Sequence, residues 1–238
     1  MSESAAVAAA PASDRSFLLR KLHSLTGIVP VGAFLLFHLF ENTKLWTSPA
    51  AYETSIRHLW DIAPRPLFYA IEVGLLAVPI LFHALYGFWI WYQGESNTGS
   101  YGYLRNWMYT AQRWSGLIAF AYMAFHVWQL RIMPDGALAL ARPDEASLTT
   151  FGQVARAITP IGSTLFYLVG GIAAAFHFGN GLFGFAYSWG LAVGRKAQQR
   201  VETLGLIVFV VLAAAVIATV FMVHVHATAD TLRAVLPH

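Results

Sequence analysis

The sequence predicts an all-α integral membrane protein, a bundle of five transmembrane helices. Of its 238 residues, 57% are hydrophobic and only 11% are charged, whereas a soluble domain carries about 25% charged residues. The apolar residues also gather in long runs. The longest run, residues 157–194, contains 38 positions without an aspartate, glutamate, lysine or arginine. Because about 20 apolar residues suffice to cross a bilayer, such a run is long enough for a transmembrane helix.

Five charge-poor runs mark the predicted spans. They cover residues 22–40, 66–93, 114–130, part of 157–194, and 204–223. Pro30 and Pro79 fall inside spans, where neighbouring helices can satisfy the carbonyls that a proline leaves free. Residues 1–15 lack the basic segment and apolar core of a signal peptide, so we expect a disordered tail there. Residues 16–226 would form the five-helix domain, and residues 227–238 a C-terminal tail.

The distribution of basic residues favours a cytoplasmic N-terminus and an external C-terminus. Lysine and arginine counts on the two sides are nearly equal, eight against seven. The loops on the N-terminal side are shorter, however, and their basic residues lie nearer to the span ends, where they influence orientation most. We therefore expect a multi-pass membrane protein in this orientation. The net charge of +3 fits contact with anionic lipid rather than with nucleic acid.

Four histidines lie inside predicted spans, His38, His83, His126 and His177. At about 1.5 Å per residue, each lies in the second half of its helix. Since consecutive spans run in opposite directions, His38 and His126 should share one depth, nearer the outside. His83 and His177 should share another depth, nearer the inside. A polar imidazole is costly in a membrane and is usually retained for a function.

Two layers of paired histidines predict two haem b groups, each held by two imidazoles from facing helices. The chain contains no cysteine, which excludes thiolate ligands and c-type attachment. Each ligand's other ring nitrogen is predicted to bond the carbonyl four residues earlier. Gly87 and Gly181 would give a flat macrocycle room. Three basic residues near the inner interface are candidate propionate contacts, namely Arg20, Lys21 and Arg113.

Other polar residues are weaker candidates for function. Glu72 is the one carboxylate inside a span, and it is either an interfacial acid or a proton donor to a quinone near the outer haem. His23 and Ser24 mark an alternative quinone site on the inner side. The remaining histidines, His58, His224, His226 and His238, are expected to be interfacial or solvated. A haem-free proton relay through the four buried histidines remains an alternative to the haem interpretation.

Several motifs resemble the di-haem cytochrome b558 subunits of succinate dehydrogenases. They are RKLHSLTGIVPVG at residues 20–32, FHL at 37–39, FHALYG at 82–87, YLRNW at 103–107, QR at 112–113, FHVW at 125–128 and FHFGNG at 176–181. The resemblance extends over residues 16–223. It implies a membrane anchor, in the bacterial inner membrane, for a flavoprotein subunit and an iron–sulfur subunit. The ligand scheme of the family falls on His83 and His177 for the haem nearest those partners, and on His38 and His126 for the distal haem.

The resemblance further implies electron transfer from the iron–sulfur subunit through two haems b to a quinone, most commonly menaquinone in such relatives. Succinate would be oxidised on another subunit, although some relatives run as fumarate reductases. Two rival functions share part of the sequence evidence. One is the di-haem membrane subunit of another respiratory oxidoreductase, such as a hydrogenase, formate dehydrogenase or nitrate reductase. The other is a haem-free proton-coupled transporter.

Overall fold

A computed structural model describes residues 14–62, 64–96, 98–132 and 150–227 of the chain. These residues are helical or lie in turns and short connections, and they contain no β-strand. The predicted tails, residues 1–15 and 227–238, lie almost entirely outside the described residues, as does His238. The first helix already begins at Asp14.

Two long helices form the first half of the chain, and each contains a π-helical turn. The first consists of α1 (Asp14–Thr26), the π turn η1 (Gly27–Gly32), α2 (Ala33–Asn42) and the 3-10 turn η2 (Thr43–Trp46). After α3 (Pro49–Ile62), the second consists of α4 (Arg65–Ile71), the π turn η3 (Glu72–Ala77) and α5 (Val78–Gln93). The second half contains α6 (Leu104–Val127) with the π turn η4 (Trp128–Ile132), then α8 (Thr150–Ile158), α9 (Ile161–Ser188) and α10 (Arg195–His226).

Four helices of the described residues are long and apolar enough to cross a membrane. They are Arg15–Trp46, Arg65–Gln93, Ile161–Ser188 and Arg195–His226. The predicted third span lies in α6, a helix of 24 residues. The first half of α6 carries Arg105, Gln112 and Arg113, which lower its apolar character. The structure thus shows four of the predicted spans as membrane-crossing candidates and leaves the count of five as a prediction.

The two prolines predicted inside spans lie at π turns. Pro30 lies within η1, and Pro79 follows η3 at the start of α5. Because proline lacks a backbone N–H and its ring clashes with the preceding turn, a regular α-helix cannot continue unchanged through it. A π turn widens the helix locally, and such turns are frequent at functional sites. Here they let the two long helices continue past Pro30 and Pro79.

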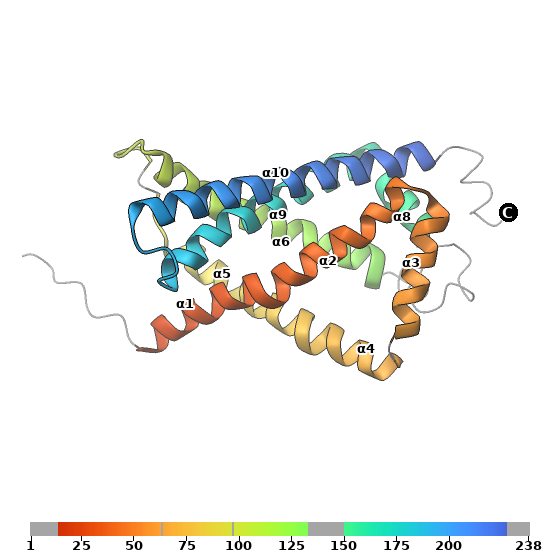
Figure 1. The fold of residues 1–238 in the computed structure, drawn as a ribbon, viewed down its shortest axis with the longest axis horizontal. Helices are drawn as coiled ribbons and strands as arrows, with labels where there is room; N and C mark the ends of the chain where they lie inside the picture. Colours follow the sequence, from red (N-terminus) through yellow and green to blue (C-terminus); the bar gives the residue numbers. More distant parts are fainter. Residues whose placement is uncertain (1–13, 63, 97, 133–149, 228–238) are drawn as a thin grey trace, which may run out of the picture.

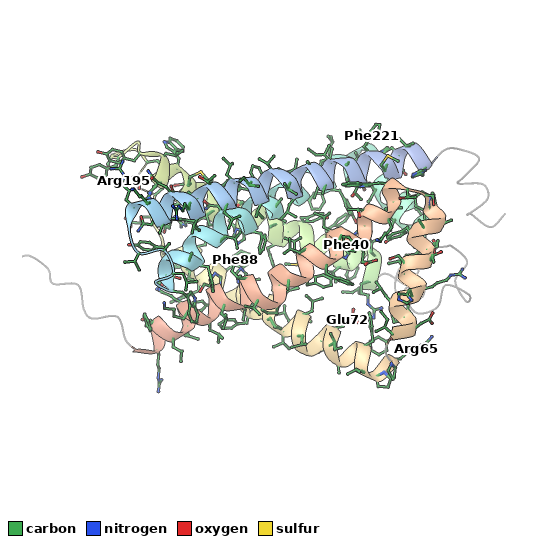
Figure 2. The ribbon with its side chains drawn as sticks, viewed as in Figure 1. Phe40, Arg65, Glu72, Phe88, Arg195 and Phe221 are labelled. Carbon is green, nitrogen blue, oxygen red and sulfur yellow. The ribbon has the colours of Figure 1, made fainter. Side chains whose placement is uncertain are left out.

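The long helices run in alternating directions along one axis (Figure 1). α9 packs against α6 and α10, and α1 packs against α5. The bundle has an α1 end, where α1 and α10 begin, and an α3 end, where α3 and α8 lie across the helix termini (Figure 1). Arg195 and Phe221 mark positions near the two ends of α10 (Figure 2).

The largest buried core lies at the α3 end rather than midway along the bundle. It includes Leu45, Tyr52, Phe151, Tyr167 and Val223, from five different helical segments. The short helices α3 and α8 were not predicted, because they lie in the charged connections between the apolar runs. The carboxylate of Glu53 on α3 accepts a hydrogen bond of 2.6 Å from the Phe151 N–H at the start of α8. This contact satisfies one of the free N–H groups at a helix N-terminus.

Nearer the α1 end, α9 and α10 pack backbone to backbone where Gly179 meets Gly205. A Cβ on Gly179 would lie 2.6 Å from the Gly205 carbonyl oxygen and 2.9 Å from the Phe209 Cβ. Such a separation is tighter than any ordinary contact, so only glycine fits. Small residues commonly allow close helix packing in membranes.

Candidate functional site

The four span histidines lie in two couples, each formed by alternate long helices, which run in the same direction. His38 on α2 faces His126 on α6, with ring centres 5.7 Å apart and ring planes at 76°. His83 on α5 faces His177 on α9, with ring centres 6.1 Å apart and planes at 85°. The structure brings together the same couples that the depth argument predicted. We call them the outer pair (His38, His126) and the inner pair (His83, His177).

The spacing of each pair fits two imidazoles bound to one metal ion from opposite sides. Metal–imidazole bonds of about 2 Å on either side put the two ring centres roughly 6 Å apart. Within the described residues, no group of three or more histidine, cysteine, aspartate or glutamate side chains could hold a metal. A pair of imidazoles alone therefore suits an iron whose remaining ligands come from a porphyrin. The residues present fit a bis-histidine haem.

In the inner pair, each ring is fixed by a main-chain carbonyl on another helix. His83 Nδ1 donates to the His23 carbonyl at 2.9 Å, and His177 Nδ1 donates to the Gln112 carbonyl at 3.0 Å. The prediction of bonds to Pro79 and Ala173, four residues earlier, is therefore wrong for these two nitrogens. A carbonyl only accepts, so both rings carry their proton on Nδ1 and leave the Nε2 lone pair available to a metal.

The outer pair has a different environment, built mainly from aromatic rings. The Nδ1 atom of His126 is buried without a hydrogen-bond partner, so the predicted bond from it to the Tyr122 carbonyl is absent. The rings of Tyr122 and Tyr167 each lie 5.7 Å from that of His126. Phe34 stacks on His38 at 5.3 Å. An unpartnered buried nitrogen costs free energy, and binding of a ligand at this position would remove that cost.

Two glycines pack against the rings of the inner pair, and they differ from Gly87 and Gly181, whose role in making room for a macrocycle stays a prediction. A Cβ on Gly116 would lie 2.8 Å from His177 Cε1, and a Cβ on Gly27 would collide with the His83 ring. Gly87 instead faces the His23 ring, and Gly181 faces the Gln112 amide. The rotation of each helix about its axis decides which glycine meets a ring, and sequence spacing did not reveal it.

His23 lies against the inner pair rather than in solvent. Its ring stacks on His83 with centres 4.1 Å apart and planes at 8°, and its buried Nδ1 has no partner. Ser24, the other candidate for an inner quinone site, donates to the Lys21 carbonyl at 2.9 Å and accepts from the Trp189 indole at 3.0 Å. The two candidate residues thus lie at the α1 end, beside the inner pair.

The candidate propionate contacts are engaged with the protein itself. The Arg113 guanidinium donates to the carbonyls of Trp91 and Gly94 at the C-terminus of α5, while its buried Nε has no partner. Lys21 donates to the Ser188 carbonyl, at the end of α9. Arg20 is exposed. Of the three, Arg113 has a donor that is buried and unused.

Glu72 forms a bidentate ion pair with Arg131, which sequence reasoning did not connect with it. Arg131 donates from Nε to one carboxylate oxygen at 2.8 Å and from Nη2 to the other at 3.0 Å. The two side chains are only 28% and 27% exposed. Glu72 lies on the helix formed by α4 and α5, toward the α3 end (Figure 2). Glu72 and Arg131 belong to η3 and η4, so two π turns carry this pair.

Two further histidines tie helix ends together. His224 bonds to Thr164 Oγ1 at 3.1 Å through Nε2, and His226 Nε2 donates to the Leu45 carbonyl at 3.0 Å. Both were expected at an interface, and both lie at the C-terminus of α10. His58 is exposed on α3. These three lie outside the two pairs.

Sequence reasoning also missed Gln112 and Asn180. Gln112 Nε2 donates to the His177 main-chain carbonyl, and Asn180 Nδ2 donates to Gln112 Oε1. Both occur in the quoted motifs, QR and FHFGNG. The sequence did show that each of these polar amides lies in or next to an apolar stretch. It did not show that the two amides pair with one another across α6 and α9.

Comparison with known proteins supports the resemblance seen in the motifs. The succinate dehydrogenase cytochrome b558 subunit of Bacillus subtilis (strain 168) is 35% identical to this chain over 199 residues. The aligned part covers 84% of this chain and 93% of that protein. No family model and no solved structure matches. The identity over most of both sequences is sufficient to conclude that the chain belongs to the family of succinate dehydrogenase cytochrome b558 subunits.

Proposed function

We propose that this chain is the membrane-anchor cytochrome b subunit of a succinate:quinone oxidoreductase and carries electrons from the iron–sulfur subunit to quinone. The observation that carries the proposal is the pairing of imidazoles, with ring centres at 5.7 Å and 6.1 Å. His38 and His126 would hold one haem b, and His83 and His177 a second. When bound, each iron supplies one-electron redox chemistry, which the amino-acid side chains of this chain lack.

The protein's own residues hold the ligands in place. The carbonyls of His23 and Gln112 orient the inner pair through Nδ1, and they leave Nε2 of each ring free to bind. Arg113, with its unused buried Nε, is the best placed of the basic candidates to meet a propionate. In this proposal, α6 also crosses the membrane, since it supplies His126, and it brings the number of transmembrane helices to five.

Orientation and partners follow from charge at the α1 end. Exposed basic residues gather there on α1 and α10, namely Arg15, Arg20, Arg195, Lys196 and Arg200. Their position favours a cytoplasmic α1 end and an external α3 end. The flavoprotein and iron–sulfur subunits would then dock at the α1 end, nearest the inner pair.

Glu72 is proposed to pass protons to a low-potential quinone, menaquinone, at the α3 end of the bundle.

 The two Arg131 hydrogen bonds hold its carboxylate, so one of these bonds must weaken before Glu72 takes up a proton. Replacing Glu72 by Gln keeps the shape and removes the acid. We expect slower quinone reduction and slower proton uptake in Glu72→Gln. If both rates equal those of the unaltered complex, Glu72 has no such role.

The proposal is tested by counting haem in the purified complex. A reduced-minus-oxidised absorption spectrum should show b-type bands with two haems for each copy of this chain. His38→Ala should lose the haem of the outer pair, and His83→Ala that of the inner pair. His58→Ala, which changes an exposed histidine outside both pairs, is the matched control and should retain two. Absence of b-type bands in the unaltered complex would favour the proton-coupled transporter.

A further inference from the structure

Gln112 on α6 and His177 on α9 are joined by two reciprocal hydrogen bonds. The Gln112 side-chain Nε2 donates to the His177 main-chain carbonyl at 3.0 Å. In return, His177 Nδ1 donates to the Gln112 main-chain carbonyl, also at 3.0 Å. Ser115 Oγ donates to the same Gln112 carbonyl at 3.0 Å. One residue of α6 therefore binds both the backbone and the ring of His177.

The Gln112 amide has partners at both of its ends. Its Oε1 accepts from Asn180 Nδ2 at 2.8 Å, one turn further along α9. Gln112 is partly buried. An amide withdrawn from water is costly unless its donor and acceptor are both used, and here each is bonded to α9. The bond from Asn180 also decides which way the amide points, because it requires oxygen on that side. The amide nitrogen is then directed at the His177 carbonyl.

We propose that Gln112 is a positioning residue for the inner pair, holding α6 and α9 in the register that keeps the His177 ring bonded through Nδ1. This inference rests on the proposed function, since it concerns the orientation of a haem ligand. The main-chain carbonyl of residue 112 is present whatever the side chain. What the Gln112 side chain adds is the fixed distance between that carbonyl and the ring. Partners of this kind fix the tautomer and orientation of a metal-binding histidine.

Gln129 provides a matched control in the same segment of chain. Its Nε2 donates to the Ala157 carbonyl at 3.3 Å, and its Oε1 accepts from the Tyr167 hydroxyl at 3.0 Å. Gln129 thus ties η4 to α8 and α9 with two bonds, as Gln112 ties α6 to α9. The bonds of Gln129 lie toward the α3 end and do not involve His177. Replacing either glutamine by leucine removes the hydrogen bonds that its side-chain amide makes to a neighbouring helix.

The test compares Gln112→Leu, Gln129→Leu and the unaltered protein in the purified complex. Three quantities are measured: haem retained after dilution, the midpoint potential of each haem, and the low-temperature electron paramagnetic resonance signal of each haem. In Gln112→Leu we expect retention at the inner pair to fall roughly 10–100-fold. We also expect a changed resonance signal and potential there, with the outer pair unaffected. Gln129→Leu should leave the inner pair unchanged.

A second variant distinguishes the proposed role of Gln112 from simple misfolding of Gln112→Leu. Asn180→Ala removes the bond that orients the Gln112 amide but keeps Gln112 itself, so it should change the inner pair in the same direction by a smaller amount. An inner pair with unaltered signal and potential in both Gln112→Leu and Asn180→Ala would overturn the inference. An equal change in Gln129→Leu would overturn it as well, because the effect would then be general loosening. If the unaltered complex holds no haem at His83 and His177, the proposed function itself fails.

Discussion

The close packing of α9 on α10 leads to a stability prediction with a control on the same helix. Gly179→Ala places a Cβ 2.6 Å from the Gly205 carbonyl oxygen, 2.9 Å from the Phe209 Cβ and 3.0 Å from the Phe209 nitrogen. Two of these three atoms belong to the backbone of α10, so they cannot rotate away. Ordinary contact distances of about 3.5–4.0 Å then require the helices to separate by roughly 1 Å.

The expected cost is that of overpacking a close contact, about 1–3 kcal/mol. Replacing glycine by alanine inside a helix also has a favourable effect of about 0.5–1 kcal/mol. Gly184 on the same helix isolates this second effect, because a Cβ at Gly184 would have no atom within 4 Å. The free energy of unfolding of Gly179→Ala should therefore lie about 1–3 kcal/mol below that of Gly184→Ala.

The two variants can be unfolded in mild detergent by added dodecyl sulfate, with helix content followed by circular dichroism. We expect Gly184→Ala to match or slightly exceed the unaltered protein in stability, and Gly179→Ala to unfold at lower dodecyl sulfate. Equal stability of the two variants would refute the reasoning, because it would mean that α9 and α10 do not meet at Gly179.

Three further predictions concern stability. Leu45 is fully buried, so Leu45→Ala should lower the free energy of unfolding by about 2–5 kcal/mol. Leu67 is 52% exposed, so Leu67→Ala should leave that free energy nearly unchanged in the same assay. Similar losses of stability in the two variants would contradict the buried core at the α3 end. Glu53→Ala removes the acceptor of the Phe151 N–H and should cost about 0.5–2 kcal/mol of stability. The amides in the first turn of α8 should then exchange hydrogen faster. Glu53→Gln keeps an acceptor oxygen, so these amides should exchange more slowly in it than in Glu53→Ala. The Arg105–Glu202 pair, with side chains 56% and 38% exposed, should contribute less than about 1 kcal/mol, so a larger loss of thermal stability in Arg105→Gln would be inconsistent with an exposed pair.

Much of the helical architecture could be predicted from residue types alone. Long apolar runs predicted the helices that contain His38, His83 and His177, and the two span prolines were expected inside helices. The short helices α3 and α8 were missed because their apolar residues become buried only when they fold over the ends of other helices. The π turns were missed as well, since no periodicity in the sequence distinguishes them from regular helix.

Some features of the candidate site could likewise be predicted from the sequence, and others could not. Alternating helix direction and a fixed rise per residue predicted which histidines share a depth, and the structure has the rings of those couples 5.7 Å and 6.1 Å apart. Partners of the ring nitrogens were predicted within the same helix, and for the inner pair they lie on other helices. The pairing of Glu72 with Arg131 joins residues 59 positions apart, a distance over which composition and spacing carry no information.

By itself, the sequence of this protein determined that apolar helices form and which histidines share a level along the bundle, because both depend on local composition and on the constant rise of a helix. Only the tertiary structure decided which side of each helix faces which neighbour. That choice depends on packing of the whole bundle, where Gly179 must meet Gly205 and Gln112 must meet Asn180. For this reason the carbonyls that orient His83 and His177, and the glycines that make room for their rings, became apparent only once the helices were assembled.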